Sequence, residues 1–548
     1  MAITEGESFT ARNVLKSPPL TSLLMERSFM SSGGAIRYRG RSTRQQHKQP
    51  HHNYLGAIRE AIRRFWVVAP FLLLVAGQGM VFFTLSGPIS MPDYSLHDGG
   101  AWSLATGQWQ APVNDVTDSD GNIKHVQRLS GPANLFCDSN GRRNELVTDL
   151  IYSLVANNGK DPERSEQHSA LDRYSAMCEF DGRANQYLPL LYAPQAIGMR
   201  LAMHDSQWTS WTLLKSSRLA SLVCYALVGA LAVFLTGAGK WTMTMVLASP
   251  VPVFCAAAGM TDANVIVYCA LYVAIFLRLS RAGKQFGWKR TLLIALLTIP
   301  LPWLKTVYTT IALLYLTLPA RIWTWNKKLA AIGIFALVDV PIQFWFAPRQ
   351  LLWTFPGTNI ATNREWMLSH PGRLLIILLI NVVFLLTVSI WRYWRQWMGW
   401  LLPIIVITAA EIVPWKAVQS RLHETAAGKS MSRNALISAE ETSGKIASDD
   451  IAGASCVAAV RNDGSQYHLP HDADGKYARN IAIGTACVAA GLSLMFLFLS
   501  LALTWMPDLA QRNGIILFAG FQERYIWPLL PMLALATTTR QQSITSKD

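Results

Sequence analysis

Two short polar segments that border membrane-length apolar runs hold the residues best suited to chemistry. Residues 92–97 (PDYSLH) follow the first such run, and residues 520–525 (GFQERY) precede the last one. An unpaired charge beside hydrocarbon is costly, so ionisable residues at such positions are functional candidates by default. We expect the two segments to form one site on the outer face of a multi-pass membrane enzyme.

The first segment offers acid–base chemistry. Asp93 is the candidate general base, since a carboxylate can take a proton from a reacting hydroxyl. His97 lies four residues further on and shares a helical face with Asp93 if the segment is helical, where it can orient the carboxylate or bind a substrate. Asp93 and Asp98 are the residues that would hold a divalent metal, although no all-oxygen cage is visible. The alternative is that these are ordinary solvated loop residues.

The second segment offers anion binding. Arg524 has a planar guanidinium that suits phosphate oxygens, and Gln522 and Tyr525 are its neutral partners. In the alternative reading, Arg524 is an interfacial anchor that snorkels, and Tyr525 belongs to an aromatic belt. Glu523 favours that alternative, because it can neutralise the neighbouring guanidinium.

Three further charged residues are second choices for the same site. Arg218 and Lys305 lie in or beside apolar runs, and the prolines before Lys305 are typical of a cavity-lining segment rather than a lipid-facing one. Asp262 lies between two apolar runs and can bind a sugar hydroxyl or a metal. As the N-cap of a helix over 263–279 it would need no function, and this reading is favoured.

The composition indicates that these residues are positioned by membrane helices. Of the 548 residues, 51% are hydrophobic and only 15% are charged. A soluble protein would carry about 25% charged residues. The sequence therefore predicts an all-α polytopic membrane protein.

The charge distribution predicts the orientation. Residues 1–64 hold 11 Lys and Arg against 4 Asp and Glu, whereas residues 87–186 hold 8 against 14. Basic flanks stay in the cytoplasm, so we expect a cytoplasmic N-terminus and a long external loop over 87–186. The tail is predicted to be disordered over 1–50, and its basic residues suit anionic lipid heads better than nucleic acid.

The apolar runs predict about eleven or twelve membrane segments, since roughly 20 apolar residues cross a bilayer. They cover residues 65–86, 187–203, 219–236, 241–258, 263–279, 291–318, 329–346, 374–390, 400–413, 481–505 and 525–536. The run at 187–203 is short and has two prolines, so it is a re-entrant helix, a surface helix or a span. The run at 291–318 is expected to be two short helices with a kink. Asp339 and Glu411 lie near or within spans and have no assignable partners.

The chain thus divides into seven regions. They are a basic tail (1–64), a first span (65–86), an external loop (87–186), a multi-span core (187–413), a polar loop or insertion (414–479), final spans (480–538) and a cytoplasmic tail (539–548). Surface helices are expected in the external loop at 144–156 and 165–177. Cys137 and Cys178 lie in the same loop and form a disulfide or stay as free thiols.

Six local patterns, taken in order, resemble the bacterial membrane family catalogued as domain of unknown function 2142, itself distantly similar to the GT-C glycosyltransferases. They are PDYSLH at 92–97 with Ala101 and Gly107; YLPLLYAPQAIG at 187–198 with Arg218; Pro250 with Thr261 and Asp262; Lys305 with Tyr308; His370 with Pro371; and TWMP at 504–507 with GFQERY at 520–525 and Pro528. The family has Glu where this chain has Tyr94, and Gly where it has Glu523.

The resemblance implies a GT-C-like transferase in a bacterial cell membrane. Its donor would be a sugar linked to a polyprenyl phosphate, and its acceptor an envelope glycan, lipid or protein on the outer face. Asp93 would then deprotonate the acceptor hydroxyl, with His97 beside it. The departing phosphate would meet Arg524, Gln522 and Tyr525, with Arg218, Lys305 and Asp262 as further candidates. Membrane lipids are the other expected partners, and no nucleic acid is expected.

Two other classes of function stay open. A transporter or flippase for a lipid-linked glycan also fits broken helices and intramembrane charges. A non-catalytic envelope assembly protein fits the departures at Tyr94 and Glu523. No Gly-rich phosphate loop or nucleotide fingerprint stands out, which argues against an ATP-driven pump and a nucleotide-sugar enzyme.

Overall fold

The computed structural model describes residues 54–86, 94–117, 123–137, 170–173, 175–237, 239–281, 285–350, 352, 357–384, 402–412, 471–507, 509, 516 and 523–540. The chain divides after Leu55, and the account below concerns the larger unit, Gly56–Asp548. Asp93, Gln522, the tail over 1–50, the expected surface helix at 144–156 and most of 414–479 lie outside the described residues.

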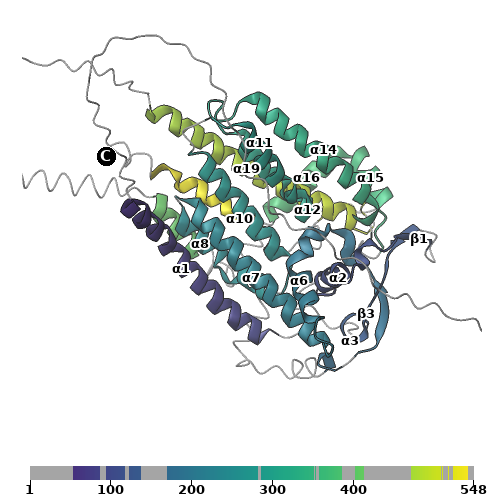
Figure 1. The fold of residues 1–548 in the computed structure, drawn as a ribbon. Coiled ribbons are helices and arrows are strands. Elements are labelled where there is room, and N and C mark those ends of the chain that lie inside the picture. Colours follow the sequence, from purple (N-terminus) through teal and green to yellow (C-terminus); the bar gives the residue numbers. More distant parts are fainter. Residues whose placement is uncertain are drawn as a thin grey trace, which may run out of the picture. The chain divides into compact units, whose positions relative to one another are not determined.

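Helices dominate this unit, and several are long and apolar enough to cross a membrane (Figure 1). Within the described ranges six apolar stretches pass that test: Phe65–Leu85 of α1 (Tyr54–Leu85), α7 (Ser210–Thr236), α10 (Asp262–Leu279), the broken series Trp288–Leu316, α14 (Trp325–Gln350) and Asn480–Thr504 of α19 (His471–Thr504). The prediction of an all-α polytopic membrane protein is thereby confirmed.

Other predicted segments are bent or short. α15 (Ile360–Ser369) and α16 (Pro371–Phe384) meet at an angle of 104°, so together they form a broken span or a re-entrant loop. Leu402–Ile412 is a shorter apolar helix. The last apolar run is a 3-10 helix, η8 (Trp527–Arg540).

Prolines divide two of the predicted spans into pieces. The run at 241–258 forms α8 (Lys240–Leu247) and α9 (Pro250–Ala257), because Ser249 is extended before Pro250 and a proline disfavours helical backbone in the residue before it. The expected kink in 291–318 is present. That run forms α11 (Trp288–Thr298), α12 (Pro300–Lys305), the 3-10 helix η4 (Thr306–Ala312) and α13 (Leu313–Leu316).

The proline-containing run at 187–203 does not form a continuous helix. It forms the 3-10 helix η3 (Pro189–Tyr192) and α6 (Ala193–Ala202), which at ten residues is too short to cross a bilayer alone. α6 packs closely on α7, since a Cβ added at Gly198 would lie 2.2 Å from the Ser216 carbonyl oxygen. This run therefore packs against neighbouring helices.

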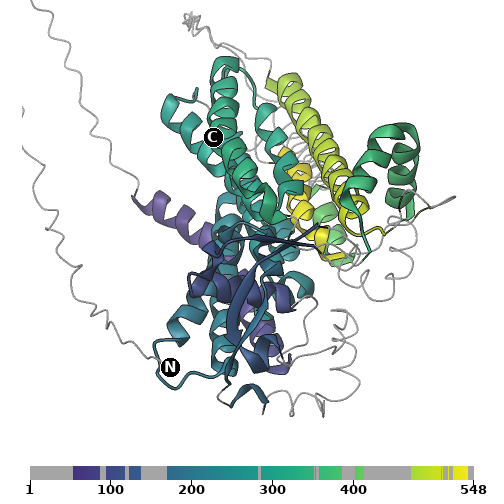
Figure 2. The same cartoon turned by 90° about the vertical axis from the view of Figure 1, so that its right-hand side faces the viewer.

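Short helices and strands occupy the described part of the first loop. α2 (Tyr94–Ala105) packs on α6 and is followed by η1 (Gln108–Gln110). β1 (Asn114–Thr117) pairs with β2 (Ile123–Val126), and β3 (Arg128–Pro132) pairs with β4 (Met177–Asp181), both antiparallel. α3 (Ala133–Phe136) follows β3, and η2 (Arg183–Gln186) follows β4. Figure 2 shows the strands in front of the helices.

The helix predicted for 165–177 does not reach its expected end. Residues 170 and 171 are helical, but Met177 begins β4 and pairs with Pro132 of β3. Cys178 of β4 is joined to Cys137 by a disulfide, with a Cα–Cα distance of 6.6 Å. Pairing with a strand more than forty residues away overrides the local helical pattern.

α10 is the most enclosed of the apolar spans. In its apolar window, 72% of residues are buried, against 17% in α14. α7, α9 and η8 pack around α10. α10 is therefore held from several sides, and its first residue, Asp262, carries the central carboxylate of the site.

Candidate functional site

Three buried charged residues from distant parts of the sequence meet at the start of α10. Lys305 Nζ donates to Asp262 Oδ1 at 2.5 Å, and Arg524 Nε lies 2.8 Å from Asp262 Oδ2. The side chains of Lys305, Asp262 and Arg524 are 12%, 3% and 5% exposed. We call these three residues the charged cluster. It unites three of the residues that the sequence offered as separate candidates.

Backbone breaks place the two cations. Lys305 ends α12, where the backbone turns extended (φ −155°, ψ 117°) before η4 begins. Arg524 lies in the short 3-10 turn η7 (Glu523–Tyr525), which η8 follows. The η7 turn is tied to η4, because the Tyr308 hydroxyl donates to the Tyr525 carbonyl oxygen at 2.8 Å. Both cationic side chains thus project from points where one helical segment ends and a 3-10 segment follows.

Asp262 does not act as the helix cap that the sequence favoured. It is the first residue of α10, and Thr261 is the N-cap without a side-chain capping bond. The positive end of the helix dipole stabilises a carboxylate in the first turn. The Asp262 carboxylate forms ion pairs with Lys305 and Arg524, so it holds these two cations rather than capping the helix.

His97 lies beside this cluster. The Thr261 amide donates to His97 Nδ1 at 3.3 Å, and Thr261 Oγ1 lies 2.7 Å from the same nitrogen. A backbone N–H can only donate, so Nδ1 is the acceptor and the proton of a neutral ring is on Nε2. His97 is 8% exposed and lines the cavity described next.

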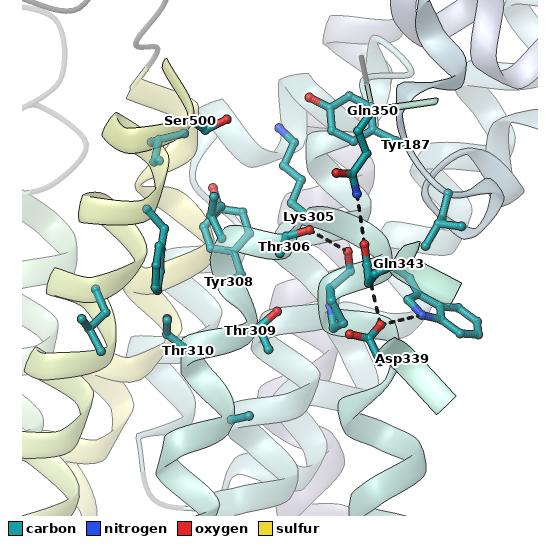
Figure 3. Close-up of a pocket in the computed structure, with 18 of the residues that line it drawn as sticks. Tyr187, Lys305, Thr306, Tyr308, Thr309, Thr310, Asp339, Gln343, Gln350 and Ser500 are labelled. Atoms are coloured by element: carbon teal, nitrogen blue, oxygen red, sulfur yellow. Dashed lines mark hydrogen bonds between the residues drawn. The ribbon is translucent and has the colours of Figure 1, made fainter. Parts of the chain in front are cut away.

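A cavity of about 1190 Å³ opens beside the charged cluster. Its polar end is lined by His97, Lys305, Arg524 and three tyrosines, Tyr187, Tyr308 and Tyr525. Lys305 Nζ lies 4.5 Å from the centre of the Tyr525 ring and 6.0 Å from that of Tyr187. Aromatic faces at these distances attract a cation. Figure 3 shows Lys305 in this pocket together with Tyr187 and Tyr308.

The remaining wall is largely apolar. Side chains of α13, α14 and α19 supply it, including Leu313, Phe335, Leu492, Phe496 and Leu499. Binding pockets commonly combine such apolar walls with a few placed polar groups. The cavity therefore suits an amphiphile with a long apolar part and a compact charged part.

The donors of the cluster suit an anion. Lys305 and Arg524 both contact the Asp262 carboxylate and both line the cavity. Buried charges are stable only when they are paired and hydrogen-bonded. Lys and Arg side chains each have several N–H donors, so an anion with several acceptor oxygens, such as a phosphate, could accept from both.

A second polar group lies in the same cavity. Trp303 Nε1 donates to Asp339 Oδ1 at 3.1 Å, and Gln343 Nε2 donates to the same oxygen at 3.2 Å. Gln350 Nε2 donates to Gln343 Oε1 at 3.0 Å. Figure 3 shows this chain of hydrogen bonds along α14. The sequence could not assign a partner to Asp339, and the structure supplies two.

Glu411, the other carboxylate left without a partner by the sequence, has a structural role. Its carboxylate accepts from the amides of Trp241 and Thr242 at 3.1 Å and from the Thr242 hydroxyl at 2.5 Å. These amides belong to the first turn of α8, whose N–H groups have no partner within the helix. Glu411 therefore caps α8.

Arg218 and Asp98 lie away from the cavity wall. Arg218 is 1% exposed on α7, and a Cβ added at Gly259 would lie 3.2 Å from Arg218 Cγ. Neither Arg218 nor Asp98 lines the cavity. Burial raises the pKa of Asp98 from its ordinary 3.8 to about 7, and the positive charge of Arg218 opposes that rise. The charge of one sequence candidate, Arg218, thus acts on another, Asp98.

Metal ligands do not gather in the part of the chain that the structure describes. No three His, Cys, Asp or Glu side chains there come close enough to share an ion. The placement of Asp93 and Gln522 falls outside the described residues. Tyr525, the remaining candidate, lines the cavity with its ring beside Lys305.

Sequence reasoning missed the residues that hold the start of α10. Asn264 Nδ2 donates to Gln195 Oε1 at 2.9 Å and to the Leu191 carbonyl oxygen at 2.8 Å. Gln195 Nε2 in turn lies 3.2 Å from Ser221 Oγ and from the Gly259 carbonyl oxygen. The signal available was a run of polar residues inside apolar segments, since buried amides need partners.

Comparison with known proteins gives one match. A family model described as "Predicted membrane protein (DUF2142)" matches residues 75–416, which is more than half of the chain. The matched range includes His97, Asp262 and Lys305 and ends before Arg524. No curated protein and no solved structure matches the chain.

Proposed function

We propose that this chain, which belongs to the DUF2142 family of predicted membrane proteins, is a membrane glycosyltransferase that uses a sugar linked to a polyprenyl phosphate. One observation carries the proposal: the charged cluster of Asp262, Lys305 and Arg524 borders a largely apolar cavity of about 1190 Å³. A polyprenyl phosphate that carries a sugar has a matching division into a long apolar chain and a compact head with an anionic phosphate diester.

The reaction would exchange one bond at the anomeric carbon. The acceptor oxygen forms a bond to that carbon as the bond from carbon to phosphate oxygen breaks. The leaving polyprenyl phosphate keeps the electron pair. Lys305 and Arg524 would stabilise the charge that develops on it, since cations placed at a developing charge lower the barrier. Asp262 would keep both cations in position.

The acceptor hydroxyl must lose its proton in this reaction. Asp93 stays the candidate general base on its sequence position, directly before α2. His97, in the first turns of α2, lines the cavity and is held by Thr261 through Nδ1. His97 would therefore bind the acceptor, with Nε2–H donating a hydrogen bond to one of the acceptor's oxygens.

Charge and redox state support a site on the outer face. The basic residues before α1 favour a cytoplasmic N-terminus, and α2 and the strands would then lie on the outer face of a bacterial membrane. The Cys137–Cys178 disulfide supports the same side, because disulfides persist outside the reducing cytoplasm. An envelope glycan, lipid or protein would be the acceptor there.

Transfer can be measured directly in reconstituted protein. Purified protein in lipid nanodiscs is mixed with polyprenyl phosphates that carry single labelled sugars and with fragments of envelope glycan. We expect label to appear in the acceptor and polyprenyl phosphate to be released, and Asp93→Asn to abolish both while the protein stays folded. Asp115→Asn, an exposed carboxylate paired with His125, is the control and should be fully active.

Two results would contradict the proposal. The first is the absence of sugar release from every donor by the wild-type protein. The second is movement of intact lipid-linked sugar across sealed vesicles without release, which would identify a flippase and which broken helices also fit.

A further inference from the structure

The group formed by Trp303, Asp339 and Gln343 has no part in the phosphate chemistry proposed above. It lines the same cavity as the charged cluster, but its hydrogen bonds run from Trp303 and Gln343 to Asp339 and from Gln350 to Gln343. Asp339 is 8% exposed and lies in a membrane-length helix. A carboxylate at such a position is costly, and a functional role is the default explanation.

The cavity face of α14 changes character along its length. Ala331, Ile332 and Phe335 line its first part, and the second part is lined by Asp339, Gln343, Phe346 and Gln350, of which only Phe346 is apolar. From Ile332 onward the spacing is three or four residues, which puts them on one face of the helix. An amphiphile along this face would therefore lie with its apolar chain at Ala331–Phe335 and its polar part at Asp339 and beyond.

The polar part of this face shares the cavity with the phosphate-binding end. Trp303, which donates to Asp339, and Lys305 both belong to α12, and both line the cavity. A lipid with its phosphate at Lys305 would therefore occupy the same cavity as the Trp303–Asp339 pair.

The chemistry of the group suits a neutral polyol. Trp303 and Gln343 both donate to Oδ1 of the Asp339 carboxylate. A carboxylate oxygen accepts strongly from a hydroxyl, and hydrogen bonds to charged groups are the stronger class. A site built to bond hydroxyls rejects ligands that lack them.

We infer that Trp303, Asp339 and Gln343 form a subsite that binds the hydroxyls of the sugar on the lipid phosphate. This inference rests on the proposed function and deepens it, because it names the residues that distinguish a sugar-bearing donor from the bare carrier lipid. Lys305 and Arg524 would bind the phosphate common to both lipids.

Binding of two short lipids separates the two parts of the site. The probes are farnesyl phosphate and farnesyl phosphates that carry one mannose, glucose, galactose or arabinose, measured against the full-length protein in detergent. We expect Asp339→Asn to weaken the best sugar-bearing probe by about tenfold, or about 1.4 kcal/mol, and to leave farnesyl phosphate unchanged. Asparagine keeps an acceptor oxygen for Trp303, so the fold is retained. Asp115→Asn should change neither probe.

Each outcome decides between the two proposals. Loss confined to the sugar-bearing probe supports the subsite. If Lys305→Met weakens both probes and Asp339→Asn weakens neither, or weakens both equally, the subsite is overturned while the proposed function stands. If the wild-type protein binds neither probe, the proposed function fails and the subsite falls with it.

Discussion

Two regions of this protein bury an aspartate beside an arginine, and they differ in what surrounds the pair. At Asp262, two cations share one carboxylate and border a large cavity. At Asp98, the carboxylate is 1% exposed, feels the charge of Arg218, and lines no part of that cavity. Burial of charge is common to both, so it does not by itself mark a site. Access to the cavity distinguishes the two regions, because Lys305 and Arg524 line it and Arg218 does not.

The two regions also differ in how well the carboxylate is satisfied. Both oxygens of Asp262 have a cation within 2.8 Å. Asp98 Oδ2 is buried with no hydrogen-bond partner within the described part of the chain, and burial raises the pKa of this side chain. Asp262 is therefore held as an anion by its partners, whereas Asp98, with a pKa of about 7, is about half protonated at pH 7.

Removal of the Asp262 carboxylate should give the largest effect and separate the two regions most clearly. Asp262→Ala leaves Lys305 and Arg524 buried without their common anion, and breaking such a pair costs about 3–5 kcal/mol. We expect a large fall in the unfolding temperature in detergent. Asp98→Ala is the comparison and should lower it much less at pH 6, where the carboxyl is mostly protonated. Equal losses would contradict the distinction.

Replacement of one cation in each region tests access to the cavity. Lys305→Met should weaken binding of farnesyl phosphate by roughly 10- to 100-fold, because a hydrogen bond to a charged group is lost. Arg218→Met, the matched change, should leave that binding unchanged even if it lowers stability. The measurement is a binding isotherm on full-length protein. Weaker binding in Arg218→Met would show that the two regions act as one site.

Asp98→Asn is expected to have the smallest effect on farnesyl phosphate binding. It should instead change how the stability of the protein depends on pH. With a folded pKa of about 7 against an ordinary value of 3.8, the folded protein holds an extra proton between these pH values. The contribution of Asp98 to the free energy of unfolding is therefore largest below about pH 4. It falls as the pH rises toward 7 and does not change further above that pH. Asp98→Asn should remove that fall.

Thermal unfolding of both proteins at pH 5 and pH 8 measures this. The wild type should lose stability relative to the variant between the two values, and farnesyl phosphate binding should be the same in both. A constant difference across this range would show that Asp98 does not titrate there.

The sequence predicted the membrane helices well because hydropathy is a local property. α7, α10, α14 and α19 match predicted runs, and the prolines at 300 and 302 correctly indicated a broken segment. Pro250 and Pro252 carried the same signal in the run at 241–258, which was nevertheless predicted as one span. The strand pairing of β3 with β4 was missed, since it depends on residues far apart in the sequence.

The sequence identified residues of the candidate site, but it could not predict which of them contact one another. Asp262, Lys305 and Arg524 were each singled out because charge is rare in apolar runs. Their mutual ion pairs join positions up to 262 residues apart, and no local pattern reports such a contact. The Trp303–Asp339 bond was invisible for the same reason. The favoured helix-cap role of Asp262 was wrong because the neighbouring Thr261 occupies that position.

The 3-10 form of η8 changes how far a short apolar run can reach. Each residue of a 3-10 helix advances about 2.0 Å, against 1.5 Å in an α-helix. The 14 residues Trp527–Arg540 therefore extend about 28 Å, close to the roughly 30 Å thickness of bilayer hydrocarbon. An α-helix of equal length would extend only about 21 Å. A length calculated from the α-helical rise per residue therefore underestimates how far this terminal segment extends.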